Sequence, residues 1–177
     1  MDKKEKQIIG QIKAGDEKAF KQLYDYYANY ALRTVYSMTR NKADASDIVQ
    51  ETFIKVYRHI ESFQEDKSFK AWFYRILINE TRTFMARKSR QAIAVEEEKV
   101  LDYFAEQTDN ESDEQLYSAL AELRATDRSI LMLKYIIGFK EKEIAEMLEL
   151  NINTVKSRLY QARNRLKRKL GGGVDEA

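Results

Sequence analysis

Cysteine and proline are absent from this chain of 177 residues, and histidine and glycine are scarce. The lack of Cys excludes disulfide bonds and thiolate metal sites, and it suits a reducing cytoplasm. The single His59 cannot build a metal site without help from carboxylates, so we expect a surface or packing residue. With no Pro and 6 Gly, few residues break a helix, and Ala, Leu, Glu, Lys, Gln and Arg are abundant. The composition therefore predicts an all-α protein.

Two longer patterns are missing as well. No run approaches the roughly 18 apolar residues that span a bilayer, and the opening MDKKEKQIIGQIKAGDEK lacks the apolar core of a signal peptide. We therefore expect a cytoplasmic protein with no direct membrane insertion. There is no Gly-rich phosphate loop, no alternation of strands and helices, and, beyond His59, no partner for a catalytic Ser or Cys. We expect no enzymatic activity, no metal and no cofactor.

Charge is spread unevenly and divides the chain into three parts. Residues 1–91 carry 18 basic and 12 acidic side chains, residues 92–116 carry 1 and 9, and residues 117–177 carry 12 and 8. The middle part has few aliphatic residues and contains the turn formers TDNESD. It is predicted to be a flexible acidic linker between two small helical domains, 1–91 and 117–177. Two interpretations of the linker stay open, a solvated loop or a strip that mimics nucleic acid on a basic surface.

The C-terminal domain shows three helical segments separated by turn signals. Residues 127–137 are rich in apolar side chains and are followed by Gly138, and residues 140–148 form a short amphipathic pattern. A third helix begins near Asn153, which we expect to be its N-cap. A short helix, a tight turn and a second helix form the helix-turn-helix layout, whose second helix enters the major groove of DNA.

The third helix has one apolar stripe and is basic elsewhere. Spacings of 4, 3 and 4 residues align Val155, Leu159, Ala162 and Leu166. Residues 153–170 hold seven Lys or Arg and no acidic residue. The alternative, a solvated basic helix that closes a bundle, accounts only for basic residues in the last turn. We therefore predict contacts with DNA bases and phosphates by Asn153, Thr154, Lys156, Ser157, Arg158, Gln161, Arg163 and Arg165.

This segment resembles the second conserved domain of bacterial RNA polymerase sigma factors, in the small extracytoplasmic-function type of the sigma-70 family. The match lies in residues 143–148, EIAEML, and in residues 153–163, NTVKSRLYQAR. The resemblance implies that this domain reads the minus-35 promoter element as duplex DNA. A helix-turn-helix alone also fits an ordinary transcriptional regulator, so the N-terminal half has to decide between the two.

Two long amphipathic helices, with a polar turn at residues 41–44, are predicted in the N-terminal half. The second has a broad apolar face within residues 48–60 and acidic residues near its start, which on their own fit a well-capped helix with a Glu51 to Lys55 pair. Residues 44–53, DASDIVQETF, resemble the sigma-family segment that docks on the coiled coil of the polymerase beta-prime subunit. The resemblance implies a core polymerase-binding set of Asp44, Asp47, Ile48, Gln50, Glu51 and Phe53, in which Ile48 and Phe53 hold the helix in place.

Aromatic and basic residues interleave from Lys67 to Gln91, where seven basic side chains accompany one acid. Such a mixture suits single-stranded DNA, because aromatic rings stack on unpaired bases while cations follow the backbone. We also expect more than half of these aromatics to be structural. Residues 69–76, FKAWFYRI, resemble the sigma-family helix that recognises and opens the minus-10 element, and residues 62–69 resemble the loop that receives a flipped base. The resemblance implies DNA contacts by Lys67, Phe69, Lys70, Trp72, Tyr74, Arg75 and Asn79.

The resemblance covers about residues 8–90 and 117–170, with its motifs in the family's order. It implies a dissociable subunit that binds core RNA polymerase, through the beta-prime coiled coil and the beta flap, and directs initiation on duplex and single-stranded promoter DNA. Members of the family are usually held inactive by an anti-sigma factor, often membrane-bound, so we expect such a partner. The alternatives are a stand-alone helix-turn-helix regulator, commonly a dimer on paired half-sites, and a helical interaction protein that does not bind DNA.

Overall fold

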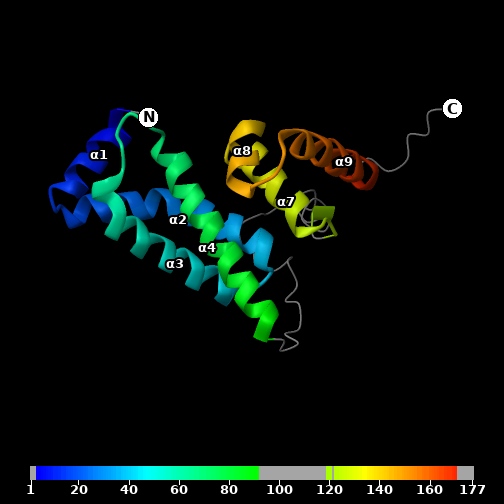
Figure 1. The fold of residues 1–177 in the computed structure, drawn as a ribbon, viewed down its shortest axis with the longest axis horizontal. Helices are drawn as coiled ribbons and strands as arrows, with labels where there is room; N and C mark the ends of the chain where they lie inside the picture. The colour runs from blue at the N-terminus through cyan, green and yellow to red at the C-terminus, as the bar shows by residue number, and fades with distance from the viewer. Residues whose placement is uncertain (1–2, 92–118, 121, 171–177) are drawn as a thin grey trace. The chain divides into compact units, whose positions relative to one another are not determined.

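The computed structural model describes residues 3–91, 119–120 and 122–170. Most of these residues are helical and none of them forms a β-strand, which confirms the all-α prediction. Within the same ranges, no helix combines the length and the apolar character needed to cross a membrane. The chain divides into two compact units, one with α1, α3, α4 and most of α2, the other with α7 to α9 (Figure 1). The predicted acidic linker lies outside the described residues.

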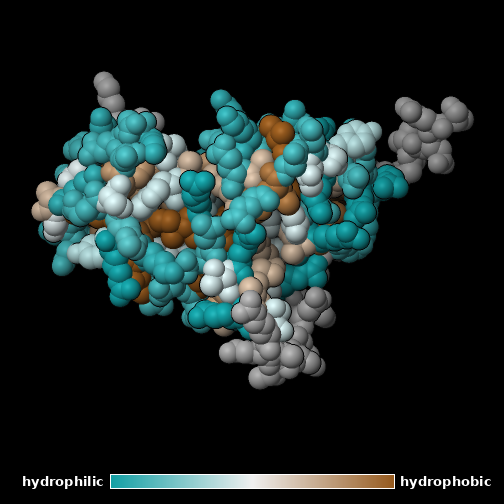
Figure 2. Space-filling view, viewed as in Figure 1, coloured by the Kyte–Doolittle hydropathy of each residue, from teal (hydrophilic) through white to brown (hydrophobic). Residues whose placement is uncertain are grey.

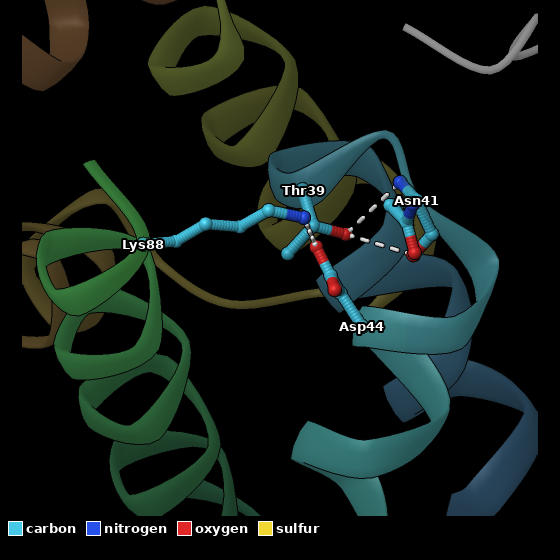
Figure 3. A network of polar contacts seen from close by, with 4 residues as sticks. All are labelled: Thr39, Asn41, Asp44 and Lys88. Atoms are coloured by element: carbon cyan, nitrogen blue, oxygen red, sulfur yellow. Dashed lines mark hydrogen bonds and ion pairs between the residues drawn. The ribbon is translucent and has the colours of Figure 1, made fainter. Parts of the chain in front are cut away.

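The N-terminal unit is built from α1 (Lys3–Lys13), α2 (Glu17–Thr39), α3 (Lys42–His59) and α4 (Phe69–Gln91). A short 3-10 helix, η1 (Ile60–Ser62), follows α3. The polar turn expected at residues 41–44 is shorter, because α3 already begins at Lys42. The Thr39 hydroxyl donates to the Asn41 carbonyl at 3.3 Å and accepts from the Asn41 N–H at 3.4 Å, which closes the turn (Figure 3).

The turn between α1 and α2 follows directly from the local sequence. Gly15 adopts a φ of 87°, in the left-handed region, and its N–H donates to the Ile12 carbonyl at 2.9 Å, so α1 ends there. Asp16 then caps α2, because its carboxylate accepts from the N–H groups of Lys18 and Ala19 at 2.9 and 3.3 Å. The end of α1 is therefore held in a fixed place relative to α2.

Aromatic rings join the helices of the N-terminal unit. Phe73 of α4 is fully buried, and its ring centroid lies 4.8 Å from that of Tyr27 on α2 and 5.2 Å from that of Phe53 on α3. Burial raises the pKa of the Tyr27 and Tyr74 phenols above the usual value, and the hydrogen bond that Tyr27 donates to Glu5 of α1 raises the pKa of Tyr27 further. The predicted apolar face of α3 is confirmed by the burial of Ile48, Val49, Phe53, Val56 and Ile60.

The C-terminal unit is built from α7 (Ala125–Leu131), the π-helical segment η2 (Met132–Ile136), α8 (Glu141–Leu148) and α9 (Ile152–Leu170). The helix predicted over residues 127–137 is thus present, but its second half widens into a π-helix in which the Ile137 N–H donates to the Met132 carbonyl at 3.0 Å. Gly138, with a φ of 86°, follows it as predicted.

The core of the C-terminal unit collects one apolar face from each helix. Ile130 of α7, Ile144 of α8 and Val155 of α9 are fully buried. The predicted stripe of α9 is confirmed at Val155, Leu159 and Ala162, which are buried, whereas Leu166 is half-buried. Hydrophilic residues cover most of the face seen in Figure 2, as the binary pattern of these helices requires.

Candidate nucleic-acid interface

Helix α9 begins with an asparagine cap, two residues before the predicted position. The Asn151 side-chain oxygen accepts from the Asn153 N–H at 2.8 Å, and the Asn151 carbonyl accepts from the Val155 N–H at 3.1 Å. The prediction that Asn153 is the N-cap is therefore wrong, because Asn153 already lies in the first turn. Its exposed side chain is left pointing outward from the leading end of the helix.

Most of the predicted DNA contacts of α9 lie on its surface. Thr154 is half-buried, and its carbonyl accepts a hydrogen bond from the Ser157 hydroxyl at 3.0 Å. Because the apolar stripe faces the core, the polar side chains are spread over the remaining faces of the helix. The exposed members of the set are Asn153, Lys156, Ser157, Gln161, Arg163 and Arg165.

Arg158 differs from the other basic residues of α9, because its guanidinium is turned inward. It donates to the Asp127 carboxylate of α7 at 2.8 Å, and the Asp127 side chain is only 9 % exposed. This ion pair links the helix that would enter the major groove to the helix packed behind it. The DNA contact by Arg158 stays a prediction, and the structure adds that its charge already has a partner inside the fold.

Tyr160 stands out among the exposed residues of α9 that are absent from the predicted set. Tyr160 is 69 % exposed in the middle of the helix, where its ring lies off the buried stripe. An aromatic residue that breaks the apolar period is the signal in the sequence that could have identified it.

Charged side chains stabilise the first turn of α8. The Glu143 carboxylate accepts from the Lys140 N–H at 2.8 Å, and Lys134 of η2 pairs with Glu141 at 2.8 Å. The hydrogen bond from Lys134 is the main cause that lowers the pKa of Glu141 below its usual value. Helix α8 ends at Leu148, and the φ of 53° at the next residue, Glu149, lets the chain turn toward α9.

The predicted polymerase-binding residues of α3 fall into a buried group and an exposed group. Ile48 and Phe53 are each 3 % exposed and anchor the helix from beneath. The exposed residues Gln50 and Glu51 follow Asp47 by three and four positions, so the three side chains share one face. The expected Glu51 to Lys55 pair is wrong, because Lys55 instead reaches across to Glu80 of α4, at 2.7 Å.

Asp44 also serves the fold. Its carboxylate, with a side chain 17 % exposed, accepts from the Lys88 ammonium at 2.6 Å, so that α4 is tied to the first turn of α3 (Figure 3). A group engaged in this way is less available to a partner protein than Asp47 or Glu51.

An apolar hollow adjoins this face of α3. It has a volume of about 470 Å³ between α2 and α3, and Gln50 is one of the residues that line it. Side chains that are in part exposed line it, among them Tyr24 at 43 %, Ile54 at 37 % and Tyr57 at 52 %.

Helix α4 buries two of the side chains that were expected to contact DNA. Phe69 and Tyr74 are 0 % and 1 % exposed, so they form the core and cannot stack on a base in this conformation. Both sides of the segment are rich in aromatics, so the periodicity did not identify the inward face. The expectation that most aromatics here are structural is confirmed, since Phe73 is buried as well. On the surface remain Lys67, Arg75 and Asn79, which are exposed, and Lys70 and Trp72, which are half-buried.

Metal-binding chemistry has no visible scaffold in the part of the chain that the structure describes. There, no group of three or more His, Asp or Glu side chains is placed to hold an ion. His59, at the end of α3, is exposed, in agreement with its expected surface role.

Each of the two units matches a known protein family. Residues 23–91 match the family model of Sigma-70 region 2, and residues 113–166 match that of Sigma-70, region 4. The chain is 34 % identical over 131 residues to RNA polymerase sigma factor SigV of Bacillus subtilis, an alignment that covers 73 % of this chain and 78 % of that protein. It is 29 % identical over 179 residues to ECF RNA polymerase sigma factor SigW of the same organism, with 93 % and 96 % covered.

A solved structure shares the arrangement of helices. The sigma factor RpoE, in complex with the anti-sigma factor NepR from Bartonella quintana, matches with a TM-score of 0.73 and 29 % identity, over 90 % of this chain and 99 % of that chain. Two family models in the expected order and relatives along most of the chain lead to one assignment. The chain belongs to the extracytoplasmic-function sigma factors of the sigma-70 family.

Proposed function

We propose that this RNA polymerase sigma factor divides promoter-specific initiation among three surfaces. The anchoring surface is Asp47, Gln50 and Glu51 of α3, which binds the beta-prime coiled coil of core RNA polymerase. Helix α9 holds the minus-35 element as duplex DNA, and the surface of α4 with its preceding loop captures the opened minus-10 strand. Catalysis belongs to the polymerase, because the sigma-70 family consists of non-catalytic initiation factors.

The observation that carries the proposal is the division of labour within α3. Two apolar residues, Ile48 and Phe53, fix the helix, and Asp44 is tied to Lys88, whereas the anchoring surface stays exposed. Among the described residues, neither Asp47 nor Glu51 forms an ion pair. Acidic side chains held on a rigid helix without internal partners suit a basic partner surface.

The two DNA-binding surfaces have different chemistry. Helix α9 offers polar and basic side chains of the kinds that read base edges and hold phosphates, namely Lys156, Ser157, Gln161, Arg163 and Arg165. Near α4, Trp72 supplies a half-buried ring, and Lys67 and Arg75 supply exposed cations. Base stacking contributes about 1–3 kcal/mol per base, which is enough to trap a flipped base but not to open a long duplex. Promoter melting therefore depends on the polymerase.

We further propose an anti-sigma factor as a partner. The matching RpoE structure is a complex with the anti-sigma factor NepR, and RpoE is 29 % identical to this chain. A protein that covers the anchoring surface would prevent assembly with polymerase without changing either unit.

Co-elution with bacterial core RNA polymerase on a sizing column tests the anchoring surface. We expect the parent protein to co-elute with core polymerase. The Asp47→Arg, Glu51→Arg variant should elute apart from it, because a basic partner surface repels the two reversed charges. The matched control is Glu61→Arg, Glu146→Arg, which makes the same change in net charge at two other exposed acids. Retention of the control together with loss of the variant locates the anchor on α3.

A different result would favour the stand-alone regulator. If the parent stays apart from core polymerase and binds duplex DNA tightly by itself, as a dimer on paired half-sites, the N-terminal unit has another role. Binding to neither polymerase nor DNA would contradict both functions.

A further inference from the structure

The loop between η1 and α4 is held at both ends. At its far end, the Ser68 hydroxyl accepts from the Ala71 N–H at 3.2 Å and the Ser68 carbonyl accepts from the Trp72 N–H at 3.1 Å, which starts α4. Between the ends, the Lys67 N–H donates to the Gln64 carbonyl at 3.0 Å and forms a turn. The exposed stretch of residues 64–68 is therefore short and shaped from within.

The near end of the loop is Phe63. Its side chain is 3 % exposed, and its ring centroid lies 5.4 Å from that of Phe69 and 5.2 Å from that of Trp72. Its N–H donates to the Ile60 carbonyl at 3.1 Å. Ring and N–H are thus both fixed, and the remaining group is the Phe63 carbonyl.

That carbonyl is bound by a lysine from a distant part of the sequence. The Lys13 ammonium, at the end of α1, donates to the Phe63 carbonyl at 2.9 Å and lies 3.8 Å from the Glu65 carboxylate. Its side chain is 20 % exposed. A cationic donor makes a stronger hydrogen bond than a neutral one, and a part-buried carbonyl without a donor would be costly. One ammonium therefore holds two residues at the near end of the loop.

Lys13 is itself placed rigidly. It is the last residue of α1, where a positive charge is favoured by the helix dipole, and Gly15 and Asp16 fix the turn that follows. Farther along α1, Glu5 accepts a hydrogen bond from the buried Tyr27 of α2. Helix α1 is thus a fixed support from which Lys13 reaches the loop.

We propose that Lys13 is a positioning residue for the base-accepting loop. The inference rests on the proposed function of residues 62–69 in receiving a flipped base. Lys13 does not contact DNA; it fixes the Phe63 carbonyl and Glu65, and through them the shape of residues 64–68 beside Trp72. Without it, the loop keeps its far anchor at Ser68 but loses the near one, so that the selectivity for the flipped base falls.

The test uses the full-length protein assembled with bacterial core polymerase. Duplex DNA with a randomised segment is offered to the parent and to Lys13→Met, and the bound fragments are sequenced to give base preferences at each position. Lys18→Met is the matched control, because Lys18 is an exposed lysine nearby on α2. Co-elution with core polymerase and thermal unfolding followed by Trp72 fluorescence accompany each variant.

We expect Lys13→Met to co-elute with polymerase and to select the same upstream motif, while the preference at one downstream position falls about tenfold, as expected when a stacked base is held less well. Lys13→Arg should restore most of the preference, and Lys18→Met should match the parent. Glu65→Gln, at a side chain that is 41 % exposed, should weaken the preference at the same position to a smaller extent. This second variant keeps the test decisive if Lys13→Met proves unstable.

Unchanged downstream preferences in Lys13→Met and Glu65→Gln would overturn the inference and leave the proposed function intact. An equal loss of upstream and downstream preferences in both variants would also overturn it, because it would mean general support of the fold. A parent that fails to join polymerase or to select any motif would overturn the proposed function, and the inference with it.

Discussion

Replacing Arg158 by Met should weaken DNA binding without removing a DNA contact. The guanidinium is paired with Asp127 on α7, at 2.8 Å, and the two side chains are 32 % and 9 % exposed. Arg158→Met leaves a buried carboxylate without its partner, whereas Asp127→Asn leaves an arginine that can turn toward water. Fully buried pairs cost about 3–5 kcal/mol when one partner is removed, and exposed pairs contribute about 0–1 kcal/mol. The first turn of α7 also favours the Asp127 charge.

Between these limits, we expect Arg158→Met to lower the free energy of unfolding of the C-terminal unit by about 2–3 kcal/mol and Asp127→Asn to lower it by about 1 kcal/mol. In a unit of this size, each kcal/mol lowers the melting temperature by about 4–8 °C. The single Trp72 lies in the N-terminal unit, so its fluorescence reports that unit alone, whereas circular dichroism reports both. We expect Arg158→Met to lower a transition seen by circular dichroism and to leave the Trp72 transition unchanged.

The salt dependence of duplex binding, measured well below the melting temperature, separates positioning from contact. Each phosphate contact contributes about 0.9 to the slope of log affinity against log salt concentration. Arg158→Met should lower the affinity at an unchanged slope, whereas Lys156→Met, at an exposed residue of the same helix, should reduce the slope by about 0.9. If Arg158→Met reduces the slope equally and leaves the melting temperature unchanged, Arg158 contacts phosphate and the positioning role is refuted.

Three further outcomes follow from the local structure. Asn151→Ala should lower the free energy of unfolding of the C-terminal unit by about 1 kcal/mol, and Asn153→Ala should lower it distinctly less, because only Asn151 caps α9. Equal losses for the two variants, measured by chemical denaturation followed by circular dichroism, would contradict this. Gly138→Ala should cost about 1–2 kcal/mol at a φ of 86°, although a Cβ there meets no atom within 4 Å; an unchanged denaturation midpoint would contradict the strain. The pKa values of Tyr27 and Tyr74 are raised in the folded protein, so on raising the pH the unfolded chain loses these protons before the folded chain does. Their contribution to the free energy of unfolding is therefore fully present below a pH of about 10 and is lost above it. Phenolate absorbance should show two tyrosines that titrate only on unfolding, and Tyr27→Phe should reduce the loss of stability at alkaline pH.

Periodicity predicted the helices well, because the faces that they bury are written into spacings of three and four residues. The stripe of Val155, Leu159 and Ala162 is buried as expected, and so is the apolar face of α3. Helix α4 shows the limit of periodicity. Aromatic residues occur on both of its sides, so spacing alone did not separate the buried Phe69 and Tyr74 from the half-buried Trp72.

Partners across the fold were beyond the reach of the sequence. Lys55 has an acid four residues away in Glu51, the spacing that favours a pair on one helix, yet it binds Glu80 on another helix. Arg158 also binds an acid that is distant in the sequence, Asp127. Such pairs depend on which helices pack together, and a one-dimensional pattern does not contain that information.

The pairing inside the fold limits how strongly α9 alone can bind a promoter. Arg158 is engaged by Asp127 and Lys169 is paired with Glu122. Among the described residues, five exposed cations of α9 then form no ion pair: Lys156, Arg163, Arg165, Lys167 and Arg168. Each phosphate that such a cation neutralises makes binding more salt-dependent, so the duplex affinity of α9 alone falls steeply as the salt concentration rises. A weak duplex contact becomes effective once the polymerase holds the other unit on the same promoter, because the second contact is then intramolecular. A salt-sensitive duplex contact by α9 therefore fits the proposed division of promoter recognition between the two units.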